Sequence, residues 1–133
     1  MHKETITYED WNGVERTEDF YFNLTEQELV KMDVQENSAL QDKIDKVIKA
    51  KSQQEILDLF EKIVYVSYGV KSEDGKRFIK SKEVKDAFLE SPAYSMIYMM
   101  LATDAQAASK FVNEIMPKPK NAPVQDVTSI VNR

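Results

Sequence analysis

Residues 91–116 constrain the fold more than any other stretch of this 133-residue chain. The stretch opens with Ser91-Pro92, a pattern typical of a helix start, because serine can cap free backbone N–H groups and proline is tolerated at the first helical position. From Tyr94 to Leu101 every residue except Ser95 is large and apolar or aromatic, so the predicted helix has no single apolar stripe. Such a helix is either surrounded by other elements or keeps part of its surface for a partner.

Two interpretations of this helix remain open from the sequence. The first and commoner one makes it a central core helix. The second makes part of it a partner-binding surface, because methionine adapts to irregular partners and is frequent on promiscuous apolar grooves. Three methionines within five residues favour this interpretation more than three leucines would. The candidate partner-binding residues are Tyr94, Met96, Ile97, Tyr98, Met99, Met100 and Leu101.

Residues 3–22 are predicted to form a β-hairpin, because two runs rich in β-branched and aromatic residues flank Asn12-Gly13. A two-residue turn and a three-residue loop compete as the connection. We favour the three-residue loop, with Gly13 left-handed and Asp10 opposite Val14, since burying one coherent apolar face outweighs one exposed like-charge pair. In that register the apolar face consists of Ile6, Tyr8, Val14, Phe20 and Phe22.

Capping signals and apolar periodicity predict helices over residues 25–116. The predicted helices begin after Thr25 (ending near Asp33), near Leu40 (with the stripe Leu40, Ile44, Val47 and Ile48), after Ser52, after Ser81, at Pro92, and after Thr103 in a capping box with Gln106. Gly69 is predicted to end the third helix as a left-handed cap. A turn at Asp74-Gly75 and a short extended segment at residues 78–80 are expected before Ser81.

These elements predict an α+β fold in which the N-terminal hairpin packs on a bundle of about five or six helices with an all-helical core. A single globular domain is expected over residues 1–117, with the hairpin at 3–22 and the helices at 25–116. Residues 118–133 show no helical period and begin within a proline-rich run, so we expect a flexible C-terminal tail that orders, if at all, on a partner.

The charge distribution argues against nucleic acid and membranes as partners. Residues 1–37 hold ten acids and three bases within a chain of net charge −5. The basic stretches at 43–51 and 76–85 are interleaved with acids on their helices, a pattern typical of exposed, salt-bridged helix faces. The longest apolar run is about ten residues, which is too short to span a bilayer.

No catalytic, cofactor or metal site is predicted. His2 is the only histidine, and we expect it at a frayed terminus where no partner fixes its ring. The chain has no cysteine, which excludes thiolate ligands and nucleophiles. Its three glycines, at 13, 69 and 75, cannot form a phosphate-binding loop. Hydrolase or transferase activity is therefore not expected.

Three blocks of the sequence carry a family resemblance. They are Thr5-Ile6-Thr7-Tyr8 with Asn12–Thr25, Tyr68-Gly69 with Ser72–Ser81, and Ala87-Phe88 and Ala93-Tyr94 with Leu101–Ala105 and Phe111-Val112. In their residues and in their order along the chain, these blocks resemble the tail assembly chaperones of long, non-contractile-tailed bacteriophages, especially those that infect Gram-positive hosts. The resemblance extends over about residues 3–117.

The resemblance implies a non-enzymatic protein that works in the host cytoplasm and is absent from the mature virion. Members of the family bind the tape measure protein, a very long helical chain, and keep it soluble while tail tube protein subunits are recruited around it. A homo-oligomer would suit a protein that coats a long partner. Many such genes also give a longer product by frameshifting near the end, where residues 118–133 lie. The family implies no cofactor and has no catalytic residues.

Two other hypotheses remain open. The chain is alternatively a small structural or completion protein retained in the phage virion, or an acidic inhibitor of a host protein. Mass spectrometry of purified virions separates the first of these from a chaperone, because a structural protein is abundant in the particle.

Overall fold

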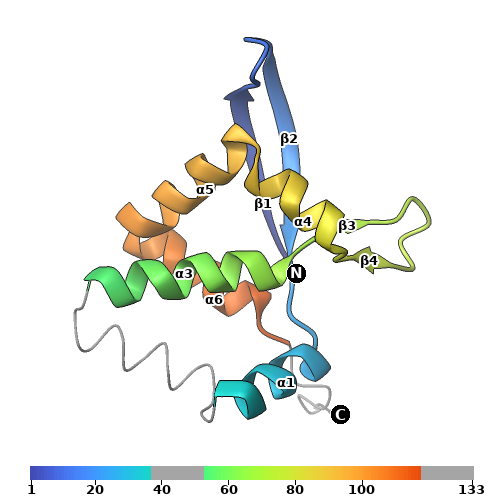
Figure 1. Ribbon diagram of the computed structural model, residues 1–133, viewed down its shortest axis with the longest axis vertical. Coiled ribbons are helices and arrows are strands. Elements are labelled where there is room, and N and C mark those ends of the chain that lie inside the picture. The colour runs from blue at the N-terminus through green and yellow to red at the C-terminus, as the bar shows by residue number, and fades with distance from the viewer. Residues whose placement is uncertain (37–52, 118–133) are drawn as a thin grey trace, which may run out of the picture.

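The computed structural model describes residues 1–36 and 53–117, drawn in colour in Figure 1. Within these ranges the α+β class is confirmed, with a four-stranded antiparallel sheet and five helices. The strands, in their order across the sheet, are β1 (His2–Glu9), β2 (Glu15–Phe22), β3 (Tyr68–Lys71) and β4 (Phe78–Ile79). The helices are α1 (Glu26–Glu36), α3 (Gln53–Ser67), α4 (Lys82–Leu89), α5 (Pro92–Thr103) and α6 (Ala105–Ile115). The predicted stripe from Leu40 to Ile48, the cap at Ser52 and the tail at 118–133 lie outside the described residues.

The hairpin register is the one expected for a three-residue loop. The backbone N–H of Asp10 donates to the Val14 carbonyl at 2.8 Å, and the Gly13 N–H donates to the Asp10 carbonyl at 2.9 Å. Gly13 has a φ of 79°, a left-handed conformation that glycine adopts without steric cost. The like-charge pair that this register implies is present, with Glu9 directly opposite Glu15.

The apolar face of the hairpin is buried along only part of its length. Ile6, Phe20 and Phe22 are buried, and Tyr8 is half-buried. Val14 was predicted on this face but is 53% exposed. The reason is that the hairpin tip extends beyond the helices, as Figure 1 shows, so nothing covers the loop end of the face.

The expectation that His2 lies at a frayed terminus is wrong. The register extends to a pair between His2 and Phe22, which puts the histidine on the covered face of the hairpin, only 2% exposed. Its ring packs edge-on against Phe111 of α6, with 5.1 Å between centroids. Nδ1 lies 2.7 Å from Glu114 Oε1, and Nε2 lies 2.6 Å from Glu4 Oε2. The start of β1 is therefore fixed to α6 by packing and by hydrogen bonds.

Gly69 does not cap α3. The chain passes from Ser67 into β3 without a turn, and Gly69 pairs with Tyr21 in the sheet. Glycine is required there by close approach, since a Cβ at this position would lie 2.8 Å from the Phe78 ring. At this junction the ammonium group of Lys85, which is 9% exposed, donates to the carbonyls of Tyr65 and Val66 in α3 and of Tyr68 in β3. The basic stretch at 76–85 was expected on an exposed helix face. This expectation is wrong for Lys85 of α4, which is buried.

The helix boundaries follow the predicted signals with three further differences. The Thr25–Glu28 capping box is confirmed, although α1 extends to Glu36 instead of ending near Asp33. Ser91 precedes α5 as expected, but its hydroxyl donates to a carbonyl of α4 instead of capping α5. The predicted cap at Thr103 is wrong because α5 continues through that residue. Asp104 caps α6 instead, accepting the backbone N–H groups two and three residues further on at 3.1 Å.

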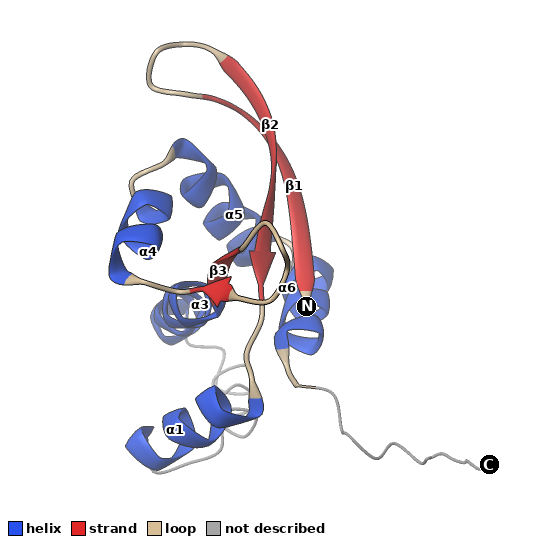
Figure 2. Ribbon diagram, turned by 90° about the vertical axis from the view of Figure 1, so that its right-hand side faces the viewer, coloured by secondary structure: helices blue, strands red, loops and turns tan. Residues whose placement is uncertain are grey.

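The core is not all-helical, because strands supply its centre. Phe22 of β2 is fully buried and contacts the rings of Tyr68, Phe88 and Phe111, with centroids 5.2–5.9 Å apart. Tyr68 of β3 and Phe88 of α4 stack at 4.0 Å. The hairpin therefore joins α4 and α6 through one aromatic cluster, and Figure 2 shows α4 and α5 on the same side of the hairpin.

Candidate partner-binding site

α5 is a core helix along one face. It packs against β1, α3, α4 and α6. Ala93, Ile97 and Leu101, spaced four residues apart, form the buried stripe and are 0%, 0% and 2% exposed. Because residues four apart lie on the same side of a helix, this stripe fixes which side of α5 faces outward.

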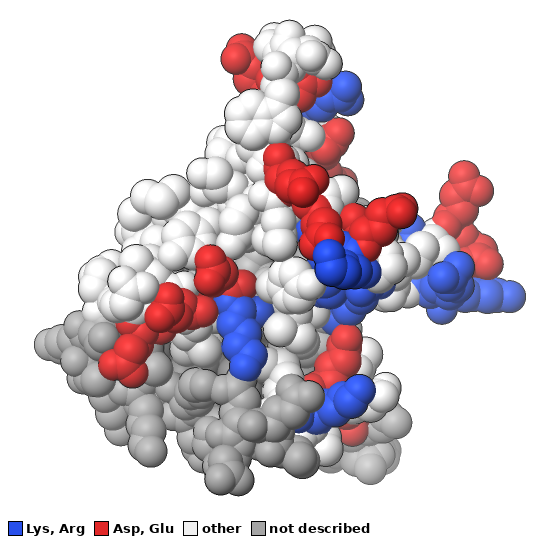
Figure 3. All heavy atoms as spheres, in the orientation of Figure 1, with Lys and Arg blue, Asp and Glu red and all other residues white. Residues whose placement is uncertain are grey.

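The outer face of α5 is apolar or neutral and open to solvent. Met96 is 45% exposed and Met99 is 53% exposed, and Ser95 and Thr103 are exposed beside them. The whole helix contains no charged residue. Figure 3 accordingly shows a surface over α5 with neither acidic nor basic side chains. We call the exposed residues Ser95, Met96, Met99 and Thr103 the outer face of α5.

The seven candidate residues divide into three groups by their positions. Met96 and Met99 are exposed on the outer face. Tyr94, Tyr98 and Met100 are half-buried along its edges. Ile97 and Leu101 are sealed in the core, where they hold the helix in place and do not reach the surface.

Acidic residues of α3 border one edge of this face. Asp58 and Glu61 are exposed on α3, which packs alongside α5. Burial raises the pKa of the Tyr98 phenol, and the nearby charges of Glu61 and Asp58 raise it further. The same two influences, burial and then Glu61, raise the pKa of Tyr94. The tyrosines of α5 therefore lie within electrostatic reach of the α3 acids, which were not among the predicted site residues. No local sequence signal marks these acids as part of the site, because their place beside α5 is set by tertiary packing.

The hairpin tip approaches the start of α5. Trp11 is 78% exposed, but its indole N–H donates to the Glu90 carbonyl at 3.0 Å, in the link between α4 and α5. This hydrogen bond ties the hairpin loop, which extends beyond the helices in Figure 1, to the link between the two helices.

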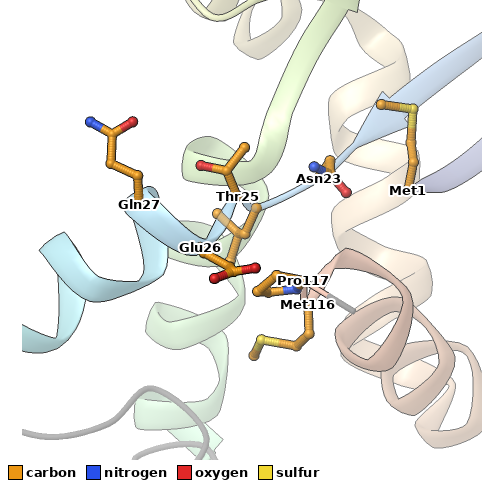
Figure 4. Close-up of a pocket in the computed structure, with 8 residues that line it drawn as sticks. Met1, Asn23, Thr25, Glu26, Gln27, Met116 and Pro117 are labelled. Carbon is orange, nitrogen blue, oxygen red and sulfur yellow. The ribbon is translucent and has the colours of Figure 1, made fainter. Parts of the chain in front are cut away.

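A pocket of about 550 Å³ lies between the start of α1 and the end of α6 (Figure 4). Its lining combines apolar and polar side chains: Met1, Asn23, Leu24, Thr25, Glu26, Gln27, Met116 and Pro117. A hydroxyl group from Thr25 and a carboxylate from Glu26 are among the polar groups of this lining. Among residues 1–36 and 53–117, no group of three or more histidine, cysteine or acidic side chains is placed to hold a metal ion.

A protein-family model described as Phage tail assembly chaperone matches residues 1–125. The chain belongs to this family. The match confirms the resemblance drawn from the three sequence blocks and covers both the hairpin and α5. No curated protein and no solved structure matches the chain.

A tail assembly chaperone works on protein partners during tail assembly, which directs attention to exposed protein-binding surfaces. No helix in the described part of this chaperone is both long and apolar enough to cross a membrane. The outer face of α5 is its candidate partner-binding site.

Proposed function

We propose that this tail assembly chaperone binds the tape measure protein through the outer face of α5, keeps it soluble and helps to recruit tail tube protein subunits. The observation that carries the proposal is a helix without charge that leaves two methionines about half exposed in the folded chain. A chaperone acts here by covering apolar surface of another chain, with no bond made or broken and no cofactor.

The apolar contact made by a single chaperone is weak, so the partner must be long enough to bind many copies. Covering a half-exposed methionine contributes about 1 kcal/mol, so Met96 and Met99 together supply about 2 kcal/mol per chaperone. One such contact is too weak to hold two proteins together at low concentration. Many copies along one extended chain, with contacts between the copies, give the required avidity. The proposal therefore includes a homo-oligomer that forms along the tape measure protein.

The proposal also states where the chaperone works and which residues act as one domain. The chaperone works in the host cytoplasm while the tail assembles, and it is not retained in the mature virion. Residues 1–117 act as one domain. Mass spectrometry of purified virions tests whether the chaperone is retained, because abundant chaperone in the particle would favour the structural or completion-protein hypothesis.

Co-expression with the tape measure protein tests the function. We expect the full chain to copurify with the tape measure protein and keep it soluble, and Met96→Gln/Met99→Gln to lose both properties. Glutamine matches methionine in length and helix propensity, so the change removes apolar surface with little effect on α5 itself.

The matched control is Val30→Gln/Val70→Gln, which removes apolar side chains that are 61% and 40% exposed on α1 and β3. The control should copurify as the wild type does. If the wild-type chain neither copurifies nor solubilises its partner, the chaperone proposal fails. If the methionine variant behaves like the control, the site is not on α5.

A further inference from the structure

We infer that the outer face of α5 receives an amphipathic helix of the partner, with apolar residues over Met96 and Met99 and lysine or arginine residues against Asp58 and Glu61. This inference rests on the proposed function and specifies the chemistry of the segment that is bound. Three features of α5 support it. Its outer face presents two methionines beside small side chains, acidic residues border that face, and the backbone groups of the helix are already paired with one another.

The border of α5 is acidic along its side and at both ends. α3 carries Glu55, Asp58 and Glu61, all exposed, against the single base Lys62. Residues three apart lie on the same side of a helix, so the three acids form a row. In Figure 3 acidic side chains lie over α3, beside the uncharged surface over α5.

The sequence continues the same sign beyond the helix ends. Glu90 is exposed two residues before α5, and Asp104 is exposed immediately after it. No base intervenes between these two acids in the sequence. A partner that covers the methionines must therefore approach a neutral face with negative charge on its borders, and a segment with basic flanks is complementary to it.

The backbone of the site favours a helix over an extended strand. α5 satisfies its backbone groups internally, so it offers a strand no free edge to pair with. Its outer face instead presents two methionines three residues apart, with the small side chains Ser95 and Thr103 beside them. Side chains of a second helix fit into such a surface by ridge-and-groove packing.

The acids should decide which helix binds and how fast, more than how tightly. Exposed ion pairs are weak individually and are screened by salt. We therefore expect neutralisation of Asp58 and Glu61 together to weaken binding of a basic helix by about tenfold at low salt. Near 500 mM salt the same change should have almost no effect.

Two designed peptides test the inference directly. Both carry the same leucine face at helical spacing, and they differ in having lysine or glutamate at every flanking position. Each is titrated with the full chain by fluorescence anisotropy at about 50 mM and about 500 mM NaCl. We expect the lysine peptide to bind at least about tenfold more tightly at low salt, with most of the difference lost at high salt.

The variant Asp58→Asn/Glu61→Gln should lose this preference. The matched control is Glu73→Gln/Glu83→Gln, which removes the same charge from exposed positions on the β3–β4 turn and α4. The control should bind the lysine peptide within about twofold of wild type. Equal binding of the two peptides, or equal loss in both variants, would overturn the inference.

The outcomes separate this inference from the proposed function. If the tape measure protein copurifies through Met96 and Met99 but neither peptide binds, the helix inference is wrong and the chaperone function stands. If the lysine peptide binds as expected but the tape measure protein does not copurify, the function fails and the surface chemistry stands. Sedimentation adds a third arm: a dimer that Met96→Gln/Met99→Gln dissolves would make a second copy the occupant and overturn the inference.

Discussion

We expect the wild-type chain to become more stable as the pH rises from 7 to 9, and replacing Lys85 by methionine should abolish that gain. Lys85 projects from α4, and its ammonium group donates to two carbonyls in the last turn of α3, those of Tyr65 and of Val66 at 3.2 Å, and to the carbonyl of Tyr68 in β3 at 3.0 Å. Three donors thus meet three acceptors, but the charge is held in a site that is 9% exposed. The bonds fix the junction between α3 and β3, while burial of the charge destabilises the protonated form.

The magnitude follows from the pKa of this amine. Burial, together with the positive charge of Lys80 and against the opposing charge of Glu28, lowers the pKa of Lys85 from 10.5 to about 8. Between these two pKa values the unfolded chain binds the proton and the folded chain does not, so stability rises with pH. The cost of burying the charge is fully present below pH 8 and is relieved above it. Linkage gives a gain of about 1.3 kcal/mol between pH 7 and pH 9.

Urea unfolding at the two pH values measures this gain. With a slope of about 2 kcal/mol per M, the wild-type midpoint should rise by about 0.6 M relative to that of Lys85→Met, in which every other titrating group is retained. Lys85→Arg is a second comparison, because it keeps the donors but stays charged, and it should show no such rise. If wild type and both variants respond equally to pH, Lys85 is not the titrating group and the derivation is refuted.

Two further predictions concern packing and acid stability. Gly69→Ala should destabilise the fold by about 1–2 kcal/mol, because the new Cβ meets the Phe78 ring at 2.8 Å, and most of that loss should disappear in a Phe78→Ala background when thermal unfolding is compared across the double-mutant cycle. The hydrogen bond to His2 lowers the pKa of Glu114 below 4.5, so its stabilising contribution is present above pH 4.5 and is lost as the pH falls through the lower folded value. Glu114→Gln should therefore flatten the acid limb of a pH–stability curve, and an unchanged limb would show that this contact does not contribute.

The features that the sequence predicted correctly depend on neighbouring residues. The hairpin register was decided by alternation and by one glycine, and both lie within residues 5–20. The caps at Thr25 and Ser81 each link a side chain to a backbone group three residues away. Such local bonds leave a signature in sequence because the partners are always a fixed distance apart.

The failures at His2 and Gly69 involve partners that are distant in sequence. His2 is buried by Phe111 and bonded to Glu114, more than a hundred residues away. Gly69 is held in a strand by Phe78 and by pairing with β2, contacts that a helix-capping rule cannot anticipate. Both residues had a plausible local interpretation that tertiary packing overrode, and no periodicity in the chain distinguishes the two outcomes.

The sequence predicted which residues belong to the candidate site but not which of them are exposed on the surface. Absence of charge and the number of methionines marked residues 94–101, yet a helix that is apolar all round gives no indication of which side is covered. The structure resolves this by packing Ile97 and Leu101 inward. The acids of α3 could not be assigned to the border, because their position beside α5 depends on how two helices separated by a strand pair and α4 come together.

The division of α5 into a buried and an exposed side bears on how a chaperone can release its partner. The helix is already formed and anchored by Ala93, Ile97 and Leu101, so binding does not have to order it. The contact itself contributes only about 2 kcal/mol per copy. Under the proposed function, a tape measure protein held by many such weak contacts would be released one site at a time as tube subunits cover it. Replacing Met96 and Met99 by leucine tests this reasoning: if it strengthens binding, it should slow transfer of the tape measure protein to tube subunits in a reconstituted assembly assay, and faster transfer with tighter binding would contradict it.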